Sequence, residues 1–213
     1  MNLSKKLIYI IALGLLTTIS CDREFDSEGV SRITTYATLT MQGEVWNRIT
    51  QGGTWTDPGG TAKEGEADID VTIGGDVVDV NTPGAYAISY TATNKDGFSS
   101  TLYRYVGVIS PGVEGIDITG SYKRDAGAMG VSTVTKIDEN LYTTDNVGGV
   151  ATGGPSTTVY FYHYDEGLLA VPSQDVMGST FSCTDATVEV GVSYRWVVVN
   201  SGYGPALRNF VKQ

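Results

Sequence analysis

The feature that most constrains this chain is the strict alternation of its side chains over residues 85–93. Aromatic and aliphatic side chains occupy one face: Tyr86, Ile88, Tyr90 and Ala92. Small and hydroxyl-bearing residues occupy the other, and a period of two is the signature of a β-strand. The Asn-Lys-Asp-Gly segment at 94–97 then predicts a hairpin turn, and residues 100–108 are expected to form the return strand.

Composition extends this β character to the rest of the chain. Gly (27 residues) and Tyr (13) are abundant, and no stretch after residue 21 shows a helical period. β-branched and aromatic residues fit pleated strands, while Gly marks the turns between them. Further strands are expected at 33–40, 43–49, 54–56, 69–73 and 77–80, so residues 30–111 are predicted to form an immunoglobulin-like β-sandwich.

A second β domain is predicted after a short linker at residues 112–116. Turn residues divide 117–213 into roughly eight strands. The clearest are expected at 118–124, 131–137, 141–144, 157–164, 168–171, 194–199 and 207–211. An antiparallel meander of this kind closes into a barrel or flattens into a sandwich, so the predicted fold class is all-β with two domains.

The N-terminus has the parts of a secretory signal at residues 1–20. Lys5 and Lys6 precede an apolar run at 7–16, and small residues lead to Cys21. The run is too short for a membrane-spanning helix, which needs roughly 20 apolar residues.

Cys21 also resembles the lipidated cysteine of a lipobox, although Thr18 stands where Leu is usual. The acidic segment 22–28 resembles the export signal of surface lipoproteins in Bacteroides-like bacteria, and residues 21–29 are predicted to be a tether. The resemblance implies lipidation at Cys21 and an outer-membrane protein facing the cell exterior. An ordinary signal peptide with a chance cysteine, and a plain solvated linker, are the alternatives.

The charge balance excludes one class of partner. The chain has a net charge of −10, which becomes −12 when residues 1–20, with two lysines and no acid, are removed. Such a surface repels phosphate backbones, so no nucleic-acid partner is expected.

The first domain resembles the bacterial surface Ig-like family. The resemblance rests on GTWTDPGGTA at 53–62, DIDVT at 68–72 and PGAYAISYTATN at 83–94, followed by Arg104, Val106 and Val108. It implies a spacer or adhesion module without catalysis.

The second domain resembles the C-terminal domain of Bacteroides lipoproteins encoded beside SusC/SusD-like importers. The resemblance rests on residues 120–122, 141–142, 194–196 and 200–204. It implies an accessory protein of a SusC/SusD-like importer complex that binds an oligosaccharide or a peptide.

Aromatic residues are the candidate ligand-binding groups. Strand alternation places Tyr160, Tyr162 and Tyr164 on one face, where they would suit stacking on sugar rings, and Trp196 and Tyr203 could join them. A sheet face covered by neighbouring strands, or an interface between the two domains, is the alternative. Trp46 and Trp55 are interpreted as core or interface residues.

No catalytic site is predicted. His163 is the one histidine and is interpreted as structural, Cys183 as a buried small residue, and G-x-S-x-G, P-loop and dinucleotide motifs are absent from the sequence. No cofactor and no metal are expected, with a Ca²⁺ site at Asp68, Asp70, Asp76 and Asp79 as a minor alternative.

These observations favour a non-catalytic binding lipoprotein of a nutrient-uptake system. An exposed aromatic surface on the second domain would support that hypothesis. A structural or adhesive surface protein is the alternative, and aromatic residues buried at a domain interface would support it.

Overall fold

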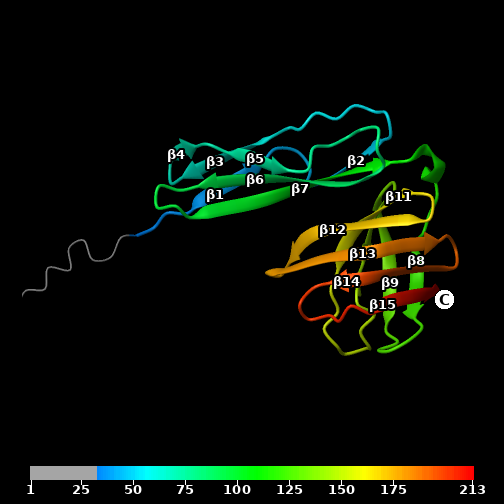
Figure 1. Cartoon of the computed structure of the whole chain (residues 1–213). Helices are drawn as coiled ribbons and strands as arrows, with labels where there is room; N and C mark the ends of the chain where they lie inside the picture. Colours follow the sequence, from blue (N-terminus) through cyan, green and yellow to red (C-terminus); the bar gives the residue numbers. More distant parts are fainter. Residues whose placement is uncertain (1–32) are drawn as a thin grey trace, which may run out of the picture. The chain divides into compact units, whose positions relative to one another are not determined.

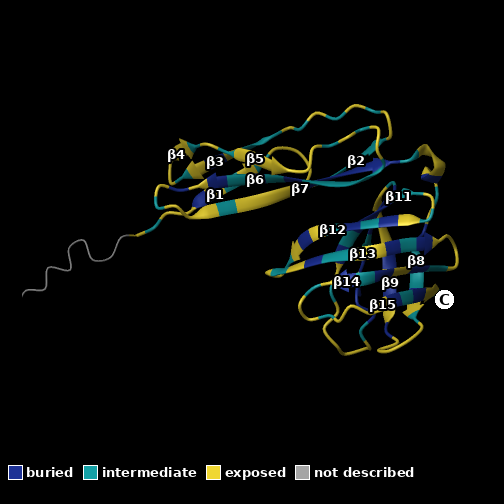
Figure 2. Ribbon diagram, in the orientation of Figure 1, coloured by how far each residue is buried: buried dark blue, intermediate teal, exposed yellow. Residues whose placement is uncertain are grey.

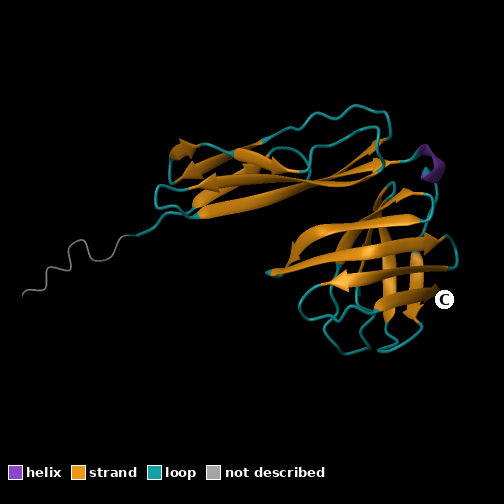
Figure 3. Cartoon of the chain, in the orientation of Figure 1, coloured by secondary structure: helices purple, strands orange, loops and turns teal. Residues whose placement is uncertain are grey.

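The computed structural model of the chain describes residues 33–213, which contain fifteen strands and one 3₁₀ turn (Figure 1, Figure 3). The predicted signal peptide at 1–20, lipidation at Cys21 and the tether at 21–29 lie outside the described residues. Within residues 33–213, no helix is long and apolar enough to cross a membrane.

The first domain is a two-sheet sandwich, as the sequence predicts. One sheet has the order β1-β3-β4 and the other β2-β7-β6-β5, with β2 parallel to β7 and the remaining pairs antiparallel. The strands are β1 (Ala37–Met41), β2 (Trp46–Thr50), β3 (Gly60–Glu64), β4 (Ala67–Ile69), β5 (Thr72–Gly75), β6 (Gly84–Thr93) and β7 (Ser99–Ile109).

The strand predicted at 69–73 is wrong in one respect, because the chain changes sheet within it. β4 ends at Ile69 and pairs with β3, whereas β5 begins at Thr72 and pairs with β6. Ile69 and Val71 still pack on the core, but Ile73 is exposed. The apolar alternation of the sequence therefore runs across the point where the chain passes from one sheet to the other, and the sequence pattern does not mark that point. The segments predicted at 54–56 and 77–80 are not strands, and β3 was not predicted.

The core of this domain contains one charged group, the guanidinium of Arg104, which is completely buried. It forms an ion pair with Asp57 and donates a hydrogen bond of 2.8 Å to the Tyr90 hydroxyl. The guanidinium also donates to the main-chain carbonyls of Gln42 and Glu44. A buried charge must be paired in this way to be tolerated, and these bonds fix the loop between β1 and β2.

A 3₁₀ turn, η1 (Pro111–Val113), leads into the second domain, which is a closed antiparallel barrel. Each strand pairs with the next along the chain, and β15 pairs with β8 to complete the barrel. The strands are β8 (Gly120–Arg124), β9 (Val131–Asp138), β10 (Leu141–Thr144), β11 (Val159–Asp165), β12 (Leu168–Val176), β13 (Ser179–Glu189), β14 (Ser193–Val199) and β15 (Leu207–Lys212).

Buried positions alternate along the barrel strands, because every second side chain points inward (Figure 2). On β11, Val159, Phe161 and His163 are completely buried. Tyr160, Tyr162 and Tyr164 therefore lie on the outer face of β11, as the alternation predicts.

Candidate functional site

Tyr162 is not available to a ligand, which corrects its predicted role. Its side chain is completely buried, and its hydroxyl donates a 2.8 Å hydrogen bond to the Asn47 carbonyl of β2. The ring lies against Gly107 of β7, where even a methyl group would come within 2.5 Å of it. Burial raises the pKa of Tyr162 above its ordinary value. The Ig-like domain thus covers the centre of the predicted tyrosine row.

Trp196 is also wrong as a ligand residue, because it points into the barrel. It is completely buried, and its indole N–H donates to the Val147 carbonyl over 2.8 Å. Its ring lies 5.5 Å from that of Phe161 and 4.6 Å from that of Tyr194. A buried indole needs a partner for its N–H and apolar neighbours for its rings, and Trp196 has both inside the core.

Tyr164 and Tyr203 are half-buried and line two different cavities. Tyr203 packs edge-on against Phe181, with the Arg208 guanidinium 5.3 Å from its ring centroid. The five predicted residues therefore do not form one platform. Ligand contact by Tyr160, Tyr164 and Tyr203 stays a prediction.

Tyr160 instead forms part of an aromatic stack with Trp46. The Trp46 indole lies between Tyr105 and Tyr160, with ring centroids 4.1 Å and 4.7 Å away and interplanar angles of 16° on both sides. Each ring of the stack covers apolar area of the next. The interpretation of Trp46 as a core or interface residue is confirmed, and both faces of its ring are occupied.

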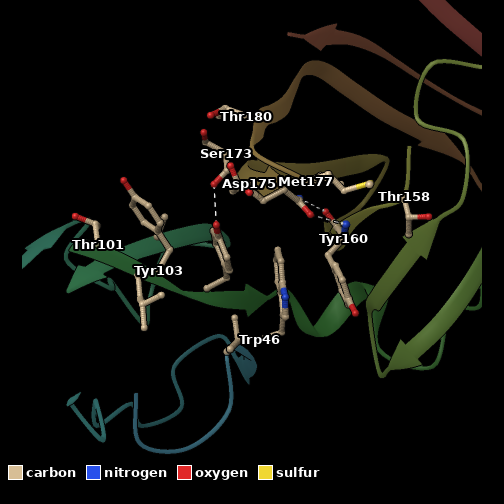
Figure 4. A pocket seen from close by; sticks show the side chains of 15 residues that line it. Trp46, Thr101, Tyr103, Thr158, Tyr160, Ser173, Asp175, Met177 and Thr180 are labelled. Carbon is tan, nitrogen blue, oxygen red and sulfur yellow. Dashed lines mark hydrogen bonds between the residues drawn. The ribbon is translucent and has the colours of Figure 1, made fainter. Parts of the chain in front are cut away.

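A groove of about 850 Å³ opens beside this stack (Figure 4). One wall is the outer face of β7, with Thr101, Tyr103 and Tyr105, and the other is formed by β12 and β13, with Ser173, Asp175 and Thr180. The walls are joined by a 2.9 Å hydrogen bond from the Tyr105 hydroxyl to the Ser173 carbonyl. Burial raises the pKa of Tyr105 to about 12, so it stays a donor at neutral pH.

The far wall of the groove is fixed by the buried side chain of Gln174. Its amide accepts a hydrogen bond from the Tyr160 N–H over 2.9 Å and donates to the Tyr160 carbonyl over 2.8 Å. The pairing register of β11 with β12 runs only from Tyr162 to Asp165 on the β11 side. Gln174 therefore replaces the missing ladder bonds and positions both Tyr160 and the hairpin that follows.

Exposed apolar side chains line the mouth of the groove. Tyr103 is 46% exposed and Met177 is fully exposed. Among residues 33–213, no Lys, Arg or His lines the groove, while Asp175 does. The groove therefore offers an aromatic ring, aliphatic surface and one carboxylate.

The sequence did not point to Tyr103. The position of the groove depends on contacts between the two domains, which no local pattern around Tyr103 reveals. An extended ligand with apolar groups would fit this surface, because the aromatic and aliphatic side chains provide contact area and Asp175 provides a polar anchor.

The His163 and Cys183 side chains lie in or beside the barrel core. His163 is completely buried inside the barrel, and burial lowers its pKa. Cys183 packs at the margin of the barrel core, where burial raises the pKa of its thiol because the charged thiolate is disfavoured. Within residues 33–213, no three His, Cys, Asp or Glu side chains gather in a way that could hold a metal ion.

Comparison with known proteins agrees with the architecture of the first domain. No curated protein matches this chain. Among solved structures, a lipoprotein from Bacteroides thetaiotaomicron has 24% sequence identity and a TM-score of 0.36, with coverage of 84% of this chain and 100% of that chain. Residues 39–108, which span most of the first sandwich, match the family described as bacterial surface protein, Ig-like domain.

Proposed function

We propose that this chain is a non-catalytic surface lipoprotein that binds an oligosaccharide or peptide in the groove between its two β domains. The groove carries the proposal, because its 850 Å³ volume and exposed Tyr103 form a binding surface beside a rigid aromatic stack. In this proposal the protein serves a SusC/SusD-like importer as an accessory component.

Two sequence features support the location. The signal-like residues 1–20 followed by Cys21 favour export and lipid attachment, and residues 39–108 match a family described by its presence in bacterial surface proteins. A lipid chain at Cys21 together with the acidic segment 22–28 would hold the β domains at the outer face of the outer membrane.

The location is tested by metabolic labelling with a fatty-acid analogue and by protease treatment of intact cells. The native chain should incorporate the label and be cleaved from outside, and Cys21→Ser should not be labelled. Labelling without access to protease would place the protein on the inner face of the membrane and contradict the surface assignment.

The importer role is tested by pull-down from native membranes with the lipidated protein as bait, read by mass spectrometry. Recovery of a SusC/SusD-like pair is the expected result. The groove is tested in parallel by binding to panels of oligosaccharides and peptides, with Tyr103→Ala expected to weaken binding. Tyr36→Ala is a matched control, because Tyr36 is also an exposed tyrosine of the Ig-like domain but does not line the groove.

A structural or adhesive role is the second candidate, and the Trp46 stack favours it. The rings of Trp46, Tyr105 and Tyr160 pack against one another where the two domains meet, and one of them, Tyr160, is a predicted ligand contact. Recovery of structural surface proteins without any importer, and no binding in the groove, would favour this role over nutrient capture.

A further inference from the structure

The strand β7 has an edge that is paired along only part of its length. β2 pairs with β7 from Tyr105 to Ile109, and β7 begins six residues earlier, at Ser99. Between β1 and β2 the chain crosses from one sheet of the sandwich to the other, and it begins to pair with β7 only at Trp46. Among the described strands, none pairs with residues 99–104 on this side.

The register determines which backbone groups point outward along this edge. The Tyr105 N–H donates to the Val45 carbonyl, away from β6, so the pair of Tyr105 with Ala87 is a non-hydrogen-bonded pair of the β6–β7 ladder. Such pairs alternate along an antiparallel ladder. The N–H and C=O groups of Thr101 and Tyr103 therefore also point away from β6, at exposed positions that line the groove.

We infer that this edge of β7 binds an extended peptide, which adds a strand to the sheet in line with β2. The inference rests on the proposed function and specifies its ligand. An unpaired strand edge offers a row of donors and acceptors whose spacing matches the backbone of another strand. The ring hydroxyls of a sugar do not repeat with that spacing, so the edge favours a polypeptide over an oligosaccharide.

Side chains around the edge define the chemistry of the peptide. Every second residue of an added strand would face the groove, where Tyr103 and Met177 provide apolar surface. Asp175 is exposed at the same groove, where the described part of the chain places no basic side chain, and the whole chain carries a net charge of −10. The peptide that fits this edge therefore has an apolar side chain at every second position and a Lys or Arg beside Asp175.

The test selects peptides from a phage-displayed library of random linear sequences on the full-length protein in detergent, with an oligosaccharide panel tested alongside. Linear peptides rich in apolar residues with Lys or Arg are expected. Thr101→Pro should weaken their binding about tenfold or more, because it removes the outward N–H while leaving the ladder to β6 intact. Thr101→Val, which keeps the backbone and the side-chain size, should bind as the native protein does.

Asp175→Asn should reduce affinity only for peptides with a basic residue, and the amide oxygen can still accept the 3.0 Å hydrogen bond from Gly178 N–H. Hydrogen exchange gives a second readout on the native chain: an added peptide should slow exchange at Thr101 and Tyr103 but not at Leu102. This readout holds even if Thr101→Pro fails to fold.

Peptide binding without protection of Thr101 and Tyr103 would overturn the inference. Oligosaccharide binding in the groove without peptide binding would also overturn it, while leaving the proposed function intact. Binding of neither class would count against both, and the importer pull-down then decides whether any uptake role remains.

Discussion

The Trp46 indole of the Ig-like domain lies against the Tyr160 ring of the barrel, with centroids 4.7 Å apart and planes inclined by 16°. This contact joins residues separated by more than a hundred positions and is extended on its other side by Tyr105. Tyr162, Leu141, Ile109 and Val113 are buried in the same cluster. Stacked rings of this kind add to the stabilisation from apolar burial, so the domain interface behaves as a small hydrophobic core.

Removal of Trp46 should loosen the two domains. We expect Trp46→Ala to lower the free energy of unfolding by up to about 3 kcal/mol, the low end for a tryptophan truncation, because Trp46 is half-buried. Small-angle X-ray scattering should show a larger radius of gyration. Trp55→Ala is the control, since Trp55 packs in the Ig-like core, and it should destabilise the protein without changing the scattering. Identical scattering for Trp46→Ala and the native chain would contradict a coupling role.

Gly107 allows the close approach of Tyr162. A Cβ at this position would lie 2.5 Å and 2.6 Å from two atoms of the Tyr162 ring, and overpacking of this kind costs about 1–3 kcal/mol. We expect Gly107→Ala to lower the unfolding midpoint. Gly84→Ala is a matched strand control, because its Cβ would meet its nearest neighbour at 3.9 Å. Equal effects of the two variants would argue against a tight contact at Gly107.

The Tyr162 hydroxyl contributes a hydrogen bond between the domains. Tyr162→Phe would leave the Asn47 carbonyl without its 2.8 Å partner. An unsatisfied buried acceptor costs about 1–3 kcal/mol, measurable by chemical denaturation. Tyr164→Phe, on the same face of β11 but only half-buried, should change stability less. The reverse order of the two effects would refute this assignment.

Acid should weaken the Ig-like domain through Asp57. Burial raises the pKa of Asp57, but hydrogen bonds from Tyr90 and from the Gly59 N–H, together with the Arg104 charge, outweigh it and hold the pKa below its ordinary value. Stability from this group is therefore present above about pH 4 and is lost as pH falls through the lowered folded-state pKa.

Asp57→Asn should remove this acid dependence and leave the buried Arg104 without a counter-charge, at a cost of about 3 kcal/mol near pH 7. Asp68→Asn is the control, because its ion pair with Lys63 is exposed and 3.5 Å long. Unfolding profiles recorded from pH 2 to 7 give both results. If Asp57→Asn and Asp68→Asn behave alike, the buried pair is not a stabilising element.

His163 should make the barrel sensitive to mild acid. Neither ring nitrogen has a hydrogen-bond partner among the described residues, and burial lowers its pKa in the folded protein, against a smaller opposite effect of Asp165. The unfolded chain then takes up a proton more readily, so stability falls as pH drops below about 6.5, by at most about 1.4 kcal/mol per pH unit.

His163→Leu should abolish the dependence between pH 5 and 7 without loss of folding. Thermal unfolding at each pH is the measurement, and Asp57→Asn should keep the dependence in this range. A slope that persists in His163→Leu would assign the effect to another group.

The sequence by itself determined the all-β class of this protein and which side chains share a face on its clearest strands. Alternation on β6 and β11 fixes which side chains share a face, because the strand period is a property of the backbone itself. Turn residues divided the second domain into roughly eight strands because Gly, Asn and Asp favour the backbone conformations of turns. Family-like motifs around Trp55, Tyr86 and Arg104 identified the sandwich.

What lies against each face was decided only by tertiary structure. The same alternation that put Tyr160, Tyr162 and Tyr164 outside the barrel could not say that β2 and β7 would cover Tyr162, since covering depends on contacts far apart in the chain. The crossover between Ile69 and Thr72, the burial of Trp196 and the open edge at Tyr103 have the same origin. A strand's period is local, whereas its neighbours are set by how both domains bury their apolar faces together.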